Sequence, residues 1–396
     1  MNVRRVAEYV GRPFSEEEEK DGVVEEIVQL CSFEKLSSME SRIAGIVAAE
    51  RAIQCLDQEN QQPQSLMDFS LPSNPQGNPQ EGRGEVSTKE HNDHLSSLPR
   101  QRGFLRPIRM YKGFWVTESL LPRVLALQDH FKPRPSDLIL VTQPKSGTTW
   151  LKALLFAIMN RTNYTFAQHP LLTRNPHECV PFLEIPFRNR FSDLEAIPPP
   201  RLLATHLPYS ILASSVADCG CRLVYLCRDP KDVVVSLWHF ARKDRPDMRL
   251  SEAFESFCEG VSLSGPIWDH ILEYWRESLR RSEKVLFLKY EEMMAEPVGN
   301  VRRLAEFVGR PFSEEEEKDG VAEEIVQLCR FEKLSSSEVN KKGIYEAGEI
   351  TLPHESFFRK GQVGDWTNHL SREMGEKLDR IVQEKLAGSG LSFRAS

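Results

Sequence analysis

The sequence of 396 residues lacks the features that mark several large classes of protein. It has no apolar run of the roughly 18 residues that a membrane-spanning helix needs, and the charged stretch Met1–Glu19 has no signal-peptide core. None of its eight cysteines form a Cys-x-x-Cys pair, so zinc-ribbon spacing is absent and free thiols in a reducing compartment are favoured. The net charge of −7 disfavours a general nucleic-acid binder. We therefore expect a cytoplasmic protein with neither nucleic acid nor membrane as a partner.

The chain contains two nearly identical stretches, one at its N-terminus and one about 300 residues later. The 37-residue stretches Asn2–Ser38 and Asn300–Ser336 differ at only four positions, which indicates a recent duplication rather than a solenoid. Gln, Asn, Pro, Ser and Gly dominate the segment that follows the first copy, and such a composition cannot bury enough apolar surface to fold. We predict a partial duplicate with a short helical stretch over 1–57, a disordered linker over 58–103 and the functional domain over 104–396.

The rest of the chain reads as an α/β domain. Four short apolar runs, each a candidate buried strand, alternate with helical segments, which predicts a central, mainly parallel sheet flanked by helices. Ligands bind beyond the carboxyl ends of the strands in such sheets, and a polar cluster follows each of these runs. The predicted strands are Leu138–Thr142, Leu202–Thr205, Arg222–Cys227 and Val285–Lys289.

A phosphate-binding loop is predicted after the first of these strands. Pro144–Trp150 carries Lys145, Gly147 and two threonines that open a helix, and the N–H groups of a helix start attract anions. The loop is P-loop-like but is not a Walker A motif, because Lys145 precedes the only glycine. A P-loop kinase is therefore disfavoured. The plainer alternative is an ordinary turn between a strand and a helix.

Three further clusters can serve the same site. Arg228 and Ser236 can hold a second phosphate, although Arg228 can instead pair with a neighbouring aspartate. His206 ends the second strand and can act as a general base for a hydroxyl, or it can be a structural histidine. The loop Phe358–Trp366 has two adjacent cations and two glycines, and can close over phosphates or remain a solvated loop.

Together these motifs carry a resemblance to a known family. QPKSGTTW, THLP, RDPKDVVVS, KYEEM and FRKGQVGDW, in this order, resemble those of plant-type cytosolic sulfotransferases over Phe104–Ser396. The resemblance implies 3′-phosphoadenosine 5′-phosphosulfate (PAPS) as co-substrate, no metal, and His206, Lys145 and Ser236 as catalytic residues. It implies a nucleotide site made of Lys145, Ser146, Gly147, Thr148, Thr149, Trp150, Arg228, Ser236, Tyr290, Cys329, Arg330, Phe331, Glu332, Lys333, Leu334, Arg359, Lys360 and Gly361.

The resemblance also leaves open questions. Thr367 stands where the family signature has a final Lys, and the dimerisation signature of animal members is not matched, so we expect a monomer or a weak homodimer. The expected partner is a small hydroxylated acceptor: a flavonoid, phenol, steroid, hydroxyjasmonate or desulfoglucosinolate. The alternative is a catalytically inactive nucleotide-binding relative impaired by the N-terminal insertion. Aromatic residues that can line the acceptor pocket, or belong to the core, are Phe114, Trp115, Phe182, Trp238 and Phe240.

Overall fold

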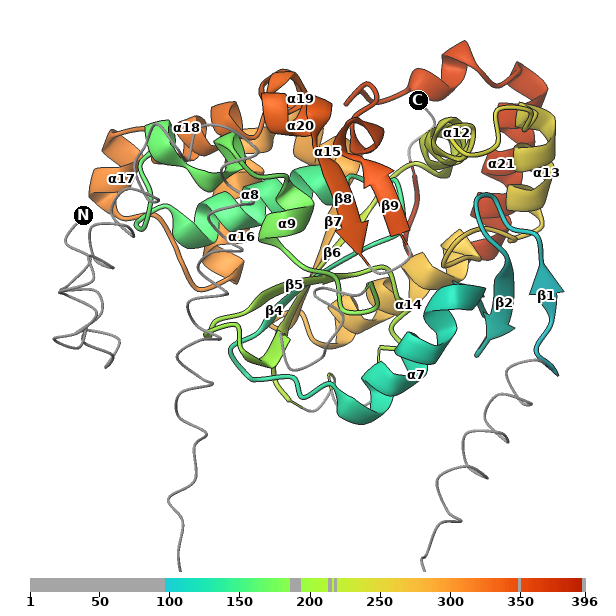
Figure 1. Ribbon diagram of the computed structural model, residues 1–396, viewed down its shortest axis with the longest axis horizontal. Helices are drawn as coiled ribbons and strands as arrows, with labels where there is room; N and C mark the ends of the chain where they lie inside the picture. The colour runs from blue at the N-terminus through green and yellow to red at the C-terminus, as the bar shows by residue number, and fades with distance from the viewer. Residues whose placement is uncertain (1–96, 186–193, 213–215, 217–218, 348–349, 394–396) are drawn as a thin grey trace, which may run out of the picture. The chain divides into compact units, whose positions relative to one another are not determined.

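The computed structural model describes residues 97–185, 194–212, 216, 219–347 and 350–393 (Figure 1). The predicted duplicate over 1–57 and most of the predicted linker lie outside these residues. The end of the linker differs from the expectation, because Arg100–Gln101 form strand β1 and the Arg100 side chain bonds the Glu118 carboxylate at 2.9 Å. Ordered structure therefore begins before Phe104.

A parallel sheet of four strands forms the centre, in the order β5-β4-β6-β7. The bounds of these strands are those predicted from the sequence: β4 Leu138–Thr142, β5 Leu202–Thr205, β6 Arg222–Cys227 and β7 Val285–Lys289. The predicted fold class is confirmed. The register pairs Val141 with Thr205 and with Tyr225, so the carboxyl ends of β4, β5 and β6 meet at one edge.

Helices cover both faces of this sheet, as Figure 1 shows for α8 and α16 on one side and α7 and α14 on the other. The helices are α7 Leu121–His130, α8 Thr148–Asn160, α9 Pro176–Cys179, α12 Pro230–Ala241, α13 Leu250–Cys258, α14 Ile267–Arg280, α15 Tyr290–Ala295, α16 Pro297–Phe307, α17 Glu314–Lys318, α18 Val321–Leu328, α19 Phe331–Ser336, α20 Glu338–Lys342 and α21 Arg372–Lys385, with short 3₁₀ turns η1 Glu118–Leu120, η2 Phe166–Gln168, η3 Pro170–Leu172, η4 His354–Phe357 and η5 Asp365–Asn368.

Strand β4 shows why its apolar run is continuous. Leu138 and Leu140 enter the core shared with α8, α16 and α18, while Ile139 and Val141 enter the core shared with α7, α12, α14 and α21. Successive side chains on a strand point to opposite faces, so a strand covered on both sides needs apolar residues at every position. The polar clusters therefore lie beyond the carboxyl ends of such strands and not within them.

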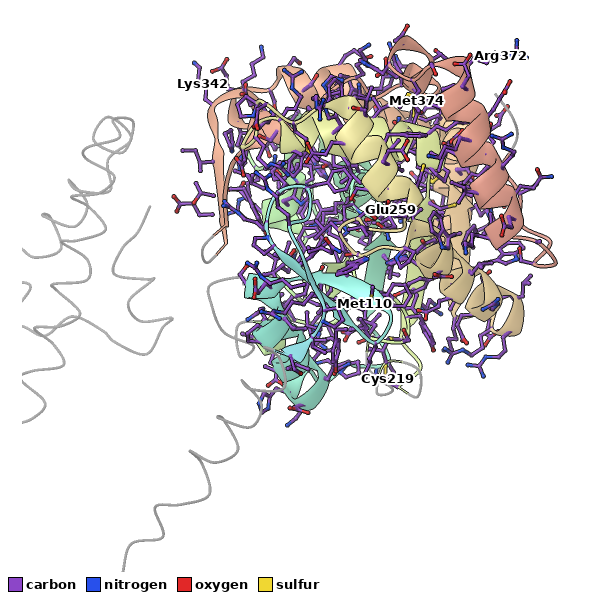
Figure 2. All side chains as sticks on the ribbon, turned by 90° about the vertical axis from the view of Figure 1, so that its right-hand side faces the viewer. Met110, Cys219, Glu259, Lys342, Arg372 and Met374 are labelled. Carbon is purple, nitrogen blue, oxygen red and sulfur yellow. The ribbon has the colours of Figure 1, made fainter. Side chains whose placement is uncertain are left out.

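Two small antiparallel sheets complete the described structure. The first joins β1, β2 Ile108–Tyr111 and β3 Phe114–Thr117, and the second joins β8 Ile344–Ala347 and β9 Ile350–Pro353. Figure 2 shows Met110 on the first of these sheets and Arg372 and Met374 at the start of α21. Within the described part of the chain, every helix is too short or too polar to cross a bilayer.

The second copy of the repeat is part of the folded body. It contributes most of α16, together with α17, α18 and the helical turn α19. Val301, Leu304, Ile325 and Leu328 from α16 and α18 are buried in the core beneath β4 and β7. The first copy has Val24 where the second has Ala322, and Ala322 is 1% exposed, so the valine would add two methyl groups at a buried position. The two copies are therefore not interchangeable.

Candidate active site

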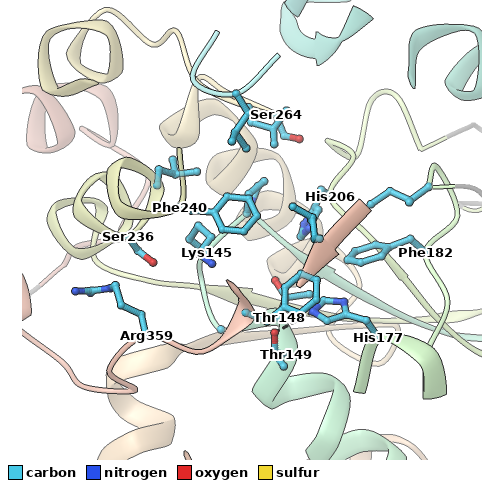
Figure 3. Close-up of a pocket in the computed structure, with 18 of the residues that line it drawn as sticks. Lys145, Thr148, Thr149, His177, Phe182, His206, Ser236, Phe240, Ser264 and Arg359 are labelled. Atoms are coloured by element: carbon cyan, nitrogen blue, oxygen red, sulfur yellow. Dashed lines mark hydrogen bonds between the residues drawn. The ribbon is translucent and has the colours of Figure 1, made fainter. Parts of the chain in front are cut away.

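A cavity of about 1000 Å³ lies at the carboxyl ends of the central strands. Its walls come from the loop between β4 and α8, the end of β5, the helix α12, the turn α19 and the loop after η4. Figure 3 shows Lys145, His206 and Ser236 converging on it from three different elements. The motifs that lie far apart in the sequence therefore share one site.

The loop after β4 is built to hold an anion. Gly147 has φ of 106°, and a Cβ there would lie 2.8 Å from the Tyr290 ring, so both its backbone and its lack of side chain are required. Lys145 also has a positive φ, 71°, which a non-glycine residue adopts at a cost. The N-terminus of α8 follows at Thr148, and the buried Ser146 Oγ has no hydrogen-bond partner among the described residues. The start of α8 therefore offers backbone N–H groups to an anion.

Lys145 is strongly influenced by its surroundings. Its Nζ lies 4.2 Å from the centre of the Phe240 ring. Burial, reinforced by the positive charges of Lys243, Arg359 and Arg228, lowers the pKa of Lys145 to about 7. A buried lysine placed among other cations is stabilised in its charged form when an anion enters the site.

Arg228, at the end of β6, provides the second cationic group. Its Nη2 donates to Asp232 at 3.0 Å and to the Gln362 carbonyl at 2.7 Å, and its guanidinium lies 4.6 Å from the centre of the Tyr290 ring. The structural ion pair considered as an alternative therefore exists. Even so, the buried Nε finds no acceptor among the residues that the structure describes. A buried guanidinium N–H without a partner favours a ligand acceptor.

The loop after η4 is tied to this arginine through Asp232. The Asp232 carboxylate accepts the backbone N–H groups of Gly364 and Trp366, at 2.8 and 2.9 Å. Within the loop Asp365 binds both Arg359 and Lys360, and these two hydrogen bonds hold the pKa of Asp365 well below its usual value despite burial. The two loop cations therefore already have a counter-ion.

His206 is held with one ring nitrogen fixed. Its Nδ1 donates to the Thr142 carbonyl at 2.8 Å, which leaves Nε2 unprotonated in the neutral ring. The buried Glu184 carboxylate accepts the His206 backbone N–H at 2.7 Å and the Thr205 hydroxyl at 2.8 Å. Burial lowers the pKa of His206 to about 3, so the ring is neutral at physiological pH. A neutral, oriented imidazole at a cavity wall has the form of a general base.

The structure brings most of the predicted nucleotide residues together. Of the three that do not line the cavity, Ser146 and Cys329 are fully buried and the Lys333 side chain is exposed. The predicted residues that line the cavity are Lys145, Gly147, Thr148, Thr149, Trp150, His206, Arg228, Ser236, Tyr290, Arg330, Phe331, Glu332, Leu334, Arg359, Lys360 and Gly361.

The predicted aromatic lining is wrong at three of five positions. Phe182 and Phe240 line the cavity, whereas Phe114 and Trp115 are buried in the strand β3, outside the lining formed by the described residues. Trp238 faces away and donates its indole N–H to the Met248 carbonyl at 2.9 Å. Residues two apart on a helix lie about 200° apart around its axis, so Trp238 and Phe240 of α12 cannot both face the cavity.

Sequence reasoning missed several residues that hold the site together. Glu184 bonds His206 and His177 bonds Thr149, and in both pairs the partners lie more than 20 residues apart. Lys152 in turn bonds His177. The ion pair between Arg228 and Asp232, by contrast, was one of the two interpretations that the sequence allowed. No group of three His, Cys, Asp or Glu side chains in the described ranges is arranged to hold a metal ion.

Comparison with known proteins identifies the relatives of this chain. A family profile described as a sulfotransferase domain matches residues 135–390. Cytosolic sulfotransferase 12 of Arabidopsis thaliana is 46% identical over 318 residues, which cover 78% of this chain and 95% of that protein. A flavonol sulfotransferase-like protein of Flaveria bidentis is 49% identical over 288 residues, covering 72% of this chain and 92% of the relative.

Solved structures agree with these relatives. The structure of a putative steroid sulphotransferase of Arabidopsis thaliana has a TM-score of 0.62 and 40% identity, covering 80% of this chain and 99% of that one. A mouse sulfotransferase complexed with PAP has a TM-score of 0.56 and 26% identity, covering 71% of this chain and 95% of the other. Each of these matches covers more than nine-tenths of the relative's chain.

Proposed function

Since the chain belongs to the plant-type cytosolic sulfotransferase family, an enzyme family that transfers the sulfuryl group of PAPS, we propose that His206 is the base that activates a small hydroxylated acceptor. The observation that carries this proposal is the fixed tautomer of His206, whose Nε2 is left for an acceptor hydroxyl by the hydrogen bond from Nδ1 to Thr142. In line with the names of its relatives, we place the enzyme in the cytosol.

The donor site that we propose fits the groups on the cavity wall. The loop from Lys145 to Thr149 would hold the phosphosulfate, and Arg228 with Ser236 would hold the 3′-phosphate, with Arg359, Lys360 and Gly361 completing that side. The unpartnered Arg228 Nε supports this assignment, because it needs an acceptor and Arg228 lines the cavity. Trp150, Tyr290 and Phe331 supply ring surfaces for the adenine.

The chemistry follows from these positions. The acceptor oxygen attacks sulfur in line with the leaving group, so a bond from the acceptor oxygen to sulfur forms while the bond from sulfur to the bridging oxygen breaks. The hydroxyl proton passes to Nε2 of His206, and 3′-phosphoadenosine 5′-phosphate (PAP) departs. Lys145 neutralises the charge that grows on the bridging oxygen. Transfer of this type depends on positioning and electrostatic stabilisation.

The acceptor that we propose has an apolar ring system. Phe240 of α12 and Phe182, which lies ahead of β5 in the chain, both face the cavity (Figure 3). The apolar wall also includes Ile108, Val116 and Leu207. Such a wall favours a phenol, flavonoid or steroid hydroxyl over a strongly polar acceptor. The names of the Flaveria and Arabidopsis relatives, flavonol sulfotransferase-like and putative steroid sulphotransferase, are of the same kind.

The proposed donor site is tested by titrating the protein with PAP. Arg228→Ala should bind PAP about 10–100-fold more weakly, because a hydrogen bond to a charged group contributes roughly 1.5–3 kcal/mol. Isothermal titration calorimetry measures the change. Arg222→Ala, at the opposite end of the same strand, is the matched control and should bind as the wild type does. Equal affinities in all three proteins would contradict the assignment of Arg228.

We propose that the functional domain includes β1 and that the first copy of the repeat is inert. It has no phosphate-binding loop of its own, and Ser32 stands where the second copy has the cavity residue Arg330. A variant without residues 2–96, which retains β1 and its Arg100–Glu118 pair, should keep the full kcat and the full affinity for PAP. A loss of more than tenfold in either quantity would show that the extension contributes to the site.

A further inference from the structure

A chain of hydrogen bonds runs from the buried Lys152 through His177 to Thr149, at the phosphate-binding loop. Lys152, on α8, is 0% exposed, and its Nζ donates to the Val180 carbonyl at 2.8 Å and lies 3.1 Å from Nδ1 of His177. Nε2 of His177 lies 2.9 Å from the hydroxyl oxygen of Thr149. Figure 3 shows Thr149 and His177 side by side at the cavity. The chain therefore links a buried lysine to a residue of the proposed phosphosulfate loop.

The chemistry of these groups gives the chain a direction. As an ammonium, Lys152 has only donors, and we assign Nδ1 of His177 as the acceptor of a hydrogen bond from Lys152. Burial lowers the pKa of His177 well below its usual value, so the neutral ring carries its proton on Nε2 and donates it to Thr149. The Thr149 oxygen is then an acceptor for His177, and its own proton is available for the cavity. Burial also lowers the pKa of Lys152, but a neutral amine still has one N–H for Val180 and one for Nδ1.

Packing holds the histidine ring in this position. His177 stacks on Phe182 with ring centres 5.5 Å apart, and its centre lies 4.1 Å from that of Phe357. Its backbone N–H donates to Asn175 Oδ1 at 2.8 Å, in the cap that starts the short helix α9. Lys152 Nζ lies 3.4 Å from the centre of the Phe182 ring. Burying a lysine among these rings is costly unless its N–H groups find partners, which here are the Val180 carbonyl and His177.

We propose that Lys152 and His177 are positioning residues that orient the Thr149 hydroxyl to donate its hydrogen bond to the sulfate-bearing phosphate of the donor nucleotide. This inference rests on the proposed nucleotide site. Without the chain, the threonine hydroxyl would be free to rotate and would donate to the anion only part of the time. The chain fixes its proton toward the cavity before the nucleotide arrives, which is preorganisation of a binding group.

A double-mutant cycle with PAP tests the proposal. Thr149→Val should weaken PAP binding about tenfold, since it removes the donor. His177→Phe should weaken it less, about threefold, since the hydroxyl remains but can turn among its staggered positions. The double variant should bind no more weakly than Thr149→Val alone, because the histidine acts only through that hydroxyl. His177→Gln, whose amide can accept from Lys152 and donate to Thr149, should recover part of the affinity. His169→Phe, another buried histidine and one outside the cavity lining of the described residues, is the matched control.

The outcomes separate this inference from the proposed function. Losses that add in the double variant, or an unchanged affinity in His177→Phe, would overturn the positioning role while PAP binding by the wild type upholds the site. Failure of the folded wild type to bind PAP would overturn both. The ¹⁵N shifts of the His177 ring give an independent measure that needs no substitution: a proton on Nε2 is expected, and a proton on Nδ1 would contradict the proposed direction.

Discussion

Replacing His206 by glutamine should lower kcat by about 10²–10⁴-fold, the range that a positioned general base contributes. The acceptor hydroxyl would lose the group that takes its proton, and the glutamine amide cannot replace it. PAP affinity should remain within about twofold of the wild type, since we place His206 on the acceptor side of the sulfur. Steady-state turnover with a phenolic acceptor and PAPS measures the first quantity, and titration with PAP measures the second.

The pairing of these two measurements makes the His206 prediction specific. A histidine that only supports the fold would, when replaced, lower thermal stability and nucleotide affinity together. A base would lower turnover alone. A kcat within threefold of the wild type in a variant that binds PAP normally would therefore remove His206 from the proposed chemistry.

Replacing Lys145 by methionine should lower kcat by about 10²–10³-fold, which is the usual loss when one preorganised group is removed from a developing negative charge. Methionine keeps the length of the side chain and its packing against Phe240, so the loss reports the charge. Lys284→Met, at the amino end of β7 and therefore far from the cavity edge, is the matched control and should keep wild-type turnover. Equal losses in both variants would point to a general effect on folding.

The pH dependence of PAP binding should follow the same lysine. Without ligand the pKa of Lys145 is about 7, and a bound phosphate raises it by stabilising the ammonium form. Binding therefore takes up a proton above pH 7, and PAP affinity should fall as the pH rises from 7 to 9, by at most tenfold per pH unit. Calorimetry in buffers of different ionisation enthalpy measures the uptake. Uptake that persists in Lys145→Met would assign it to another group.

Strand positions were predictable here because physical constraints on them are local. A strand that is buried on both faces must be apolar at each position, and the polar residue that follows marks its end. The convergence of Lys145, His206 and Arg228 was predictable as well, because parallel strands place their carboxyl ends at one edge. Family resemblance then supplied roles that the topology alone does not give.

The remaining parts of the site depend on contacts that a single sequence does not reveal. Lys152 lies 25 residues from His177 in the sequence, and nothing in either local pattern indicates that they meet. The error in the aromatic lining was avoidable in part. Phe114 and Trp115 are adjacent on a strand, so their side chains point to opposite faces and cannot both line one cavity.

Asp365 is an internal counter-ion for the two cations of the loop Phe358–Trp366. Arg359 and Lys360 share this carboxylate, so at the nucleotide site that we propose a phosphate would compete with Asp365 for the two cations. Breaking the bonds to Asp365 would offset part of the attraction between the phosphate and the cations. The same bonds would form again when the nucleotide leaves. Sulfotransfer ends with a nucleotide that retains both its 3′- and 5′-phosphates, so a site of bare cations would hold its product tightly. At the proposed site, the internal counter-ion Asp365 would favour release of PAP and hence repeated turnover.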